Sequence, residues 1–135
     1  MKDTRIEDFG KLRGLMKKYE DRFTVKTDLE GRYELWAIKD VIIEGRKRKE
    51  VFFASAIVQG SYVGFYFMPV YVDEEIRLFF SPALLKLLKG KSCFHIRSID
   101  ESLEADLGNA LKRGAALYEQ RGWTEVPKKE DGHGA

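Results

Sequence analysis

The chain contains one cysteine, three prolines and no long uncharged apolar run. The single thiol, Cys93, excludes an internal disulfide. No apolar run approaches the roughly 20 residues that a membrane-spanning helix requires. The first residues are charged and do not form the apolar stretch of a secretory signal. We therefore expect a cytoplasmic protein with no membrane partner.

Apolar residues are nevertheless abundant enough for a folded domain. They make up 44% of the 135 residues, and a chain of this length buries about two thirds of its unfolded surface on folding. The chain has 24 Lys and Arg against 22 Asp and Glu, so its net charge does not by itself indicate a nucleic-acid or membrane partner. We expect one domain over residues 1–123 and a flexible tail over residues 124–135.

Two segments show the spacing of amphipathic helices. The first runs from about Thr4 to Phe23, and its apolar stripe is Phe9, Leu12, Met16, Tyr19 and Phe23. The second runs from about Glu101 to Arg121, with Asp100 as its cap and Gly122 at its end. Its stripe is Leu103, Leu107, Leu111, Gly114 and Tyr118. Gly108 and Gly114 weaken the helix, which predicts that its backbone packs closely on a sheet.

Aromatic and β-branched runs between these helices predict three antiparallel strands, over about 33–43, 51–58 and 62–72. The segment from Glu44 to Glu50 separates the first two runs and contains four consecutive cations, so we expect an exposed hairpin tip there. Gly60 fits the second hairpin turn. Pro69 predicts a sheet edge or a bend near the end of the third strand.

A short helix and a fourth strand follow. Ser81 can cap a helix that starts at Pro82 and continues to about Lys89. The fourth strand covers about 92–97. The whole pattern predicts an α+β fold, in which an antiparallel sheet of four or more strands carries the N-terminal and C-terminal helices, and the short helix lies between strands three and four.

The strands have no clearly polar face, so the predicted sheet needs cover on both sides. Two long helices cover only one side. The second side would combine aromatic and small residues, which leaves three alternatives: ordinary core, a subunit interface, or a groove for a small molecule. The candidate ligand-binding residues are Phe52, Ala54, Ala56, Gly64 and Tyr66, with Cys93 or His95 at the margin. The expected partner is a small apolar ligand or a second copy of the chain.

Cys93 and His95 alternate along the fourth strand, so their side chains share a face. This spacing suits two metal ligands or a thiol beside a base, and an enzyme that uses both residues is one alternative. A metal site needs at least three protein ligands, and the other histidine, His133, lies in the predicted tail. We expect a structural cysteine, no metal site and no catalytic residue, and the pattern identifies no cofactor.

The cations from Arg46 to Lys49 resemble a phosphate-binding tip, and Tyr33, Trp36 and Phe52 offer stacking surfaces nearby. A solvated turn explains the same cations equally well. The predicted sheet has no RNA-binding signature. We therefore do not expect a nucleic-acid partner.

Three segments carry a family resemblance: Tyr62 to Tyr71, Leu84 to Gly90 after Ser81-Pro82, and Gly90 to Ile96. In their order they resemble the YdhG-like family, a domain of unknown function, and the similarity extends from about Tyr33 to Gly122. The resemblance implies an α+β domain with an antiparallel sheet and flanking helices, and no established reaction.

Some YdhG-like proteins are likened to frataxins and discussed as intracellular iron chaperones, so iron binding is a further alternative. Frataxin-like iron binding uses carboxylates on the first helix and the first strand. Here lysines interleave with the acids of the first helix, and the strand over 33–43 contributes only Glu34 and Asp40. We expect a non-enzymatic ligand-binding or protein-interaction module that uses an apolar sheet face.

Overall fold

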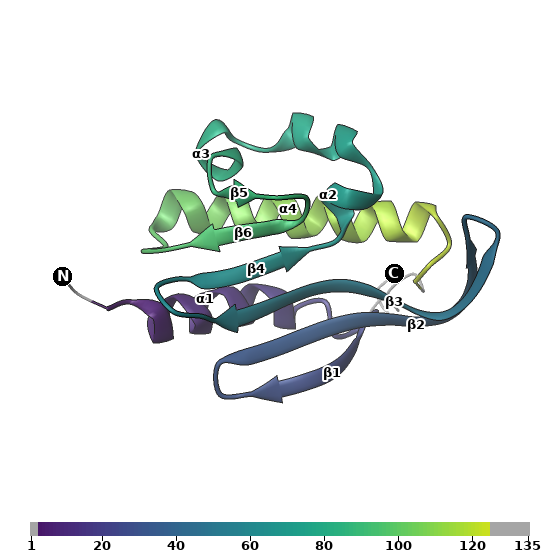
Figure 1. Ribbon diagram of the computed structural model, residues 1–135, viewed down its shortest axis with the longest axis horizontal. Coiled ribbons are helices and arrows are strands. Elements are labelled where there is room, and N and C mark those ends of the chain that lie inside the picture. The colour runs from purple at the N-terminus through teal and green to yellow at the C-terminus, as the bar shows by residue number, and fades with distance from the viewer. Residues whose placement is uncertain (1–2, 125–135) are drawn as a thin grey trace, which may run out of the picture.

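The computed structural model describes residues 3–124 and shows a six-stranded sheet with two long helices behind it (Figure 1). The elements are α1 (Arg5–Lys17), β1 (Thr24–Leu29), β2 (Arg32–Ile43), β3 (Arg46–Val58), β4 (Val63–Phe67), α2 (Pro69–Val72), the 3₁₀ helix η1 (Glu74–Phe79), α3 (Pro82–Leu85), β5 (Leu88–Lys89), β6 (Cys93–Ile96) and α4 (Glu101–Gln120).

The strands follow the order β1-β2-β3-β4-β6-β5, and every neighbouring pair is antiparallel. Helices α1 and α4 lie on the same face of this sheet (Figure 1). The predicted α+β fold class is therefore confirmed, with more strands than the four that the sequence pattern revealed.

Helix α4 begins and ends at its predicted caps, whereas α1 is shorter than predicted. The Asp100 side chain accepts a hydrogen bond from the backbone N–H of Leu103, and Gly122 follows α4 with a φ of +75°. The predicted bounds of α4 are thus confirmed. Helix α1 ends at Lys17 rather than at Phe23, because the chain turns through residues 18–23 and stacks the Phe23 ring on Phe53 at 4.0 Å.

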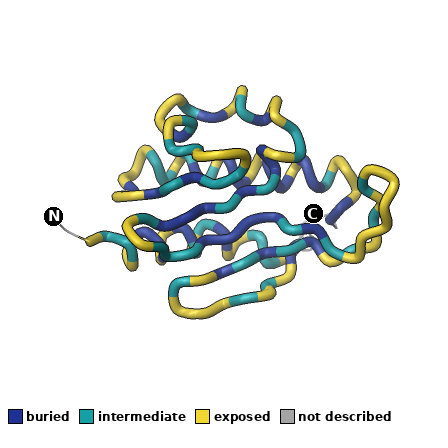
Figure 2. Tube along the Cα trace, in the orientation of Figure 1, coloured by how far each residue is buried: buried dark blue, intermediate teal, exposed yellow. Residues whose placement is uncertain are grey.

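The core fills the layer between the helices and the sheet. Phe53 lies at its centre, with Phe23 stacked on its ring and the rings of Tyr118 and Phe67 edge-on to it. Buried residues gather along β3, β4 and the facing sides of the helices, whereas the far end of the β2–β3 hairpin is exposed (Figure 2). This exposed end, residues 39–50, is called the hairpin arm below.

The hairpin arm and β1 correct two sequence predictions. The cations from Arg46 to Lys49 lie in strand β3, not in a turn; the turn is Glu44-Gly45, where φ is +52° and +78°. The cations tolerate strand geometry because the arm keeps them exposed. Strand β1 was not among the predicted strands, because it is an edge strand with no buried residue and therefore has no apolar alternation.

The segment after β4 is more helical than predicted. Pro69 does not end a strand but begins the helical turn α2. Ser81 caps α3 as predicted, through a bond from the Leu84 N–H, but α3 stops at Leu85 because the chain then enters β5. Helices α2, η1 and α3 all contact α4, so they pack beside that helix.

The predicted tail lies almost wholly outside the described residues, as does His133. Thr124, placed in the tail by the sequence analysis, is buried and donates a hydrogen bond to the Arg22 carbonyl at 2.6 Å. This bond ties the end of α4 to the turn after α1.

Candidate functional site

One face of the sheet carries no long helix. Because α1 and α4 lie on the other side, the alternation of side chains along each strand directs a second set away from both helices. This second set is called the open face. Its members include Trp36, Phe52, Ser55, Ile57, Gly64, Tyr66, Met68, Cys93 and His95, with Arg32 and Glu34 of β2 beside Ile57 and Ser55.

The structure brings five of the seven predicted ligand-binding residues to the open face: Phe52, Gly64, Tyr66, Cys93 and His95. The other two lie on the opposite face. Ala54 pairs with Leu35 and Ala56 pairs with Tyr33, and all four of these residues are fully buried on the helix side. Neither alanine lines the open face.

A β-bulge separates Phe52 from the two alanines. Trp36 pairs with Phe52 and Leu35 pairs with Ala54, so Phe53 has no partner of its own in β2. In a regular strand Phe52 and Ala54 would share a face, but the extra residue lets Phe53 and Ala54 both point towards the helices. The bulge therefore places Phe52 on the open face, where its ring packs edge-on against the Trp36 ring with the two ring centres 5.3 Å apart.

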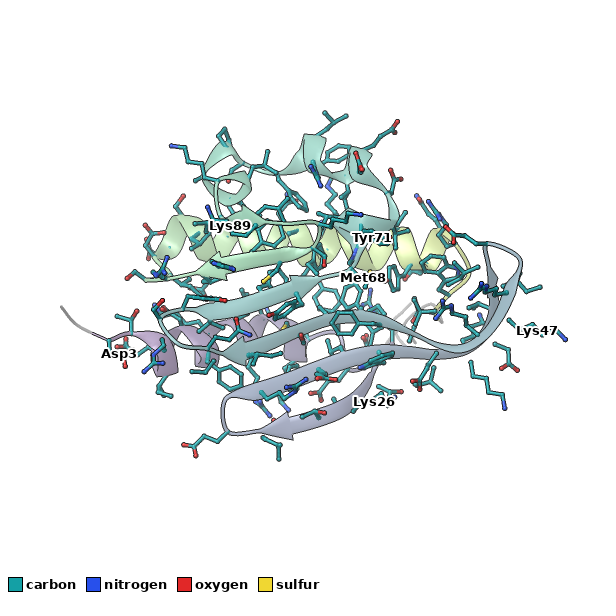
Figure 3. The ribbon with its side chains drawn as sticks, in the orientation of Figure 1. Asp3, Lys26, Lys47, Met68, Tyr71 and Lys89 are labelled. Carbon is teal, nitrogen blue, oxygen red and sulfur yellow. The ribbon has the colours of Figure 1, made fainter. Side chains whose placement is uncertain are left out.

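A hollow of about 380 Å³ lies where the open face meets the hairpin arm and α2. Its walls include the aromatic rings of Trp36, Phe52 and Tyr71 together with Met68. Figure 3 shows Met68 and Tyr71 close together where β4 leads into α2. Tyr71 is 57% exposed. The hairpin arm adds one cation, Arg48, and two carboxylates, Glu44 and Glu50, to the wall.

Cations lie over two of these rings. The Lys26 Nζ is 4.4 Å from the centre of the Trp36 ring and pairs with Glu50 at 2.7 Å. The Lys91 Nζ is 5.6 Å from the centre of the Tyr71 ring. Sequence reasoning missed Lys26, because it sits on the unpredicted strand β1, and it missed Tyr71, which it placed in a strand.

A second aromatic group lies at the other end of β4 and β6. The rings of Tyr62 and His95 stack at 3.9 Å, and the Arg97 guanidinium lies 5.7 Å from the Tyr62 ring centre. Beside them, the Tyr66 ring covers Gly64, where a Cβ would come within 2.9 Å of its Cε1 atom. Gln59 Nε2 donates to the Tyr66 hydroxyl at 2.9 Å.

Cys93 is adjacent to Tyr66 across β4 and β6, but it has no activated thiol. Burial raises the pKa of Cys93, and burial likewise raises the pKa of Tyr66. A nucleophilic cysteine requires the opposite shift. The side chains of Cys93 and His95 therefore lie on the same face, as predicted, while the Cys93 thiol stays protonated at neutral pH.

The acids of the open face are already paired. Glu34 contacts Arg32 at 2.7 Å and accepts a bond from the Trp36 indole N–H, and Glu50 pairs with Lys26. By contrast, within the described part of the chain the side chains of Arg46 to Lys49 form no hydrogen bond or ion pair. The open face and the adjoining arm thus carry excess positive charge.

Tyr33 is not a stacking surface, contrary to the sequence analysis. It is fully buried on the helix side, where its hydroxyl donates to Glu20 at 2.5 Å. Burial is also the main reason why the pKa of Tyr33 lies far above its ordinary value.

Carboxylates on α1 and β1 serve structural contacts. Asp8 accepts the backbone N–H groups of Ser98 and Ile99, and Asp28 pairs with Arg13 at 2.6 Å. Among residues 3–124 no three or more His, Cys, Asp or Glu side chains gather as a metal site would require. No helix in the described ranges has the length and apolar character to cross a bilayer.

Comparison with known proteins returned no match to a protein-family model, to a curated protein or to a solved structure. The resemblance to the YdhG-like family therefore remains a prediction from the residues quoted above.

Proposed function

We propose that this domain is a non-enzymatic binding module whose open face receives a ligand with a flat apolar body and a negative charge. The hollow between Trp36, Phe52 and Tyr71 is the observation that carries the proposal. Its volume of about 380 Å³ falls in the range of small-molecule sites, and aromatic rings form part of its apolar wall.

The charge of the ligand follows from Arg48. This guanidinium lines the hollow and has no hydrogen-bond or ion-pair partner among the described residues. Two carboxylates also line the hollow: Glu50 is paired with Lys26, whereas Glu44 has no ion-pair partner among the described residues. An anionic group on the ligand would pair with Arg48, while its flat body would contact the rings.

The state of the Cys93 thiol supports binding over catalysis at this pair of residues. Within the described chain, Cys93 and His95 are the pair that the sequence offered for nucleophilic catalysis, and the raised pKa of Cys93 opposes that role. The frataxin-like alternative has no comparable support, because Asp8 and Asp28 on the relevant elements are already engaged by N–H groups and by Arg13.

The test uses indole-3-acetate as a probe, with neutral indole-3-acetamide as its matched control. Each is titrated to about 1 mM into ¹⁵N-labelled protein while amide and indole shifts are recorded. We expect saturable shifts for the acetate at Trp36, Phe52 and Tyr71, and weaker binding of the amide. Arg48→Gln should remove the preference for the acid, whereas Lys49→Gln should keep it.

Three results would contradict the proposal: no saturable shift, shifts centred away from the open face, or sedimentation showing that the free protein is a dimer that Trp36→Ala dissociates. The last result would identify the face as a subunit interface, which is the alternative that the sequence analysis left open.

A further inference from the structure

Rings and cations alternate across the whole open face, well beyond the hollow. Lys26 accompanies Trp36 on the β1–β2 side, Lys91 accompanies Tyr71 at the end of β4, and Arg97 accompanies Tyr62 near β6. A small ligand would use only one end of this surface. The repeated arrangement fits a ligand that itself repeats a flat apolar unit and a negative charge.

We infer that the open face binds single-stranded nucleic acid, with bases stacked on its aromatic rings and phosphates on the flanking cations. This inference rests on the proposed function and names the ligand class. A combination of a cationic surface with rings for successive bases is the general basis of sequence-tolerant single-strand binding.

The dimensions of the sheet suit a short strand. From β1 through β2, β3 and β4 to β6 the sheet spans about 19 Å at the usual strand spacing of about 4.8 Å. Single-strand sites on comparable small β domains begin at about four nucleotides. The rings of Trp36, Phe52, Tyr66 and His95 come one from each of β2, β3, β4 and β6, so they provide a path across the sheet.

The cations now lying over the rings do not block this path. An exposed contact between a flexible lysine and a ring is weaker than the stack of a base on that ring. Lys91 is exposed and has no ion-pair partner among the described residues, so it can leave the Tyr71 ring when a base arrives, whereas Lys26 stays paired with Glu50 beside Trp36. The displaced ammonium group then stays within reach of the phosphate next to that base.

The distribution of charge favours an anionic polymer at this surface. Glu34 and Glu50 on the open face are already paired with cations, and Arg46 and Arg48 extend the positive charge along the hairpin arm. The arm also carries acids: over residues 39–50, five cations (Lys39 and Arg46 to Lys49) stand against Asp40, Glu44 and Glu50. The arm therefore keeps a positive excess of two charges.

The partial exposure of the Trp36 and Phe52 rings favours a single strand, rather than a duplex or a bilayer, as the ligand. Trp36 and Phe52 are only partly exposed and lie within the sheet surface, so they can accept a flat partner but do not project as wedges. A duplex keeps its bases stacked inside and would offer this surface its phosphates alone. The cations would then contact the phosphates, but the aromatic rings would have no base to stack on.

The test measures fluorescence anisotropy of a labelled oligo(dT) strand of about 15 nucleotides, with the same sequence annealed to oligo(dA) as the duplex. Titrations are made at about 50 mM and about 200 mM NaCl. Two matched pairs locate the surface. Tyr71→Ala is compared with Phe79→Ala, because Phe79 is 51% exposed against 57% for Tyr71 and also has a cation, Arg113, over its ring.

The second matched pair compares Arg48→Gln, beside the hollow, with Lys49→Gln, which does not line it. We expect the single strand to bind more tightly than the duplex and to weaken steeply with salt. Tyr71→Ala should weaken binding by at least about fivefold and Phe79→Ala by less than about twofold. Arg48→Gln should lower the salt slope by about 0.7, more than Lys49→Gln does.

The inference is overturned if the single strand does not bind, if the duplex binds equally well, or if the two variants of each pair behave alike. The indole-3-acetate titration separates this failure from that of the proposed function. Saturable acetate shifts at the open face together with no oligonucleotide binding would leave a small-molecule module. Failure of both experiments would remove both proposals.

Discussion

Gly114 of α4 lies directly against the ring of Phe67 in β4. A Cβ at position 114 would come within 2.5 Å of Phe67 Cζ and 2.8 Å of Pro69 Cγ. Both neighbours are buried, so neither can move without disturbing the core. This contact sets the distance between α4 and the sheet, and it explains a glycine that weakens the helix on its own.

Replacement of Gly114 by Ala should therefore destabilise the fold by about 1–3 kcal/mol despite the higher helix propensity of alanine. Gly14→Ala is the matched control, because a Cβ at Gly14 in α1 meets nothing within 4 Å. The control should gain up to about 1 kcal/mol. Urea unfolding measures both, and equal stability of Gly114→Ala and the parent would contradict this packing.

Asp8 ties the start of α1 to the loop between β6 and α4. It is 2% exposed and accepts the N–H groups of Ser98 and Ile99 at 2.8 and 2.9 Å. Asp8→Ala would leave these N–H groups without an acceptor and should cost about 2–4 kcal/mol. Glu7→Ala, at an exposed neighbour, should change stability by less than about 0.5 kcal/mol. A small effect at Asp8 in thermal unfolding would show that water replaces the carboxylate.

Phe52 and Phe53 are neighbours with opposite roles. Phe53→Ala removes the central core ring and should cost about 3–5 kcal/mol. Phe52→Ala acts on the open face, where the ring is partly exposed, and should cost less while abolishing the indole-3-acetate shifts. Unfolding curves and the probe titration distinguish the two. If Phe52→Ala proved as destabilising as Phe53→Ala, the bulge would not divide the faces as described.

The thiol of Cys93 should titrate above the ordinary range. Burial raises its pKa in the folded state, so between the ordinary and the raised pKa the folded protein holds less thiolate than the unfolded chain. The contribution of Cys93 to stability is complete below the unfolded pKa and declines as the pH rises towards the folded value. Iodoacetamide labelling rates across pH should show a higher midpoint for native than for urea-unfolded protein. A lower native midpoint would indicate an activated thiol.

Local sequence signals predicted the elements that carry their own caps and periodicity. Asp100 and Gly122 bounded α4, and Ser81 bounded the start of α3. Strand β1 escaped detection because an exposed edge strand needs no apolar alternation. Pro69 was assigned to a strand, since a proline after an apolar run is compatible with a sheet edge as well as with a first helical turn.

The open face was only partly predictable for a different reason. The sequence predicts that an open face exists, because the predicted strands have more apolar surface than two helices can cover. Which residues share it depends on the bulge at Phe53, and the local sequence carries no sign of that extra residue. The position of Lys26 over Trp36 depends on the pairing of β1 with β2, and β1 was not among the predicted strands.

Fluorescence of Trp36 tests the open face most directly, because it reports where a ligand binds as well as whether it binds. Trp123 also lines the hollow, so it is replaced by another ring: in a Trp123→Phe variant Trp36 is the sole tryptophan. We predict that single-stranded oligo(dT) quenches Trp36 saturably, at the same concentrations at which anisotropy records binding. Binding detected by anisotropy with no change at Trp36 would place the ligand elsewhere and contradict the account.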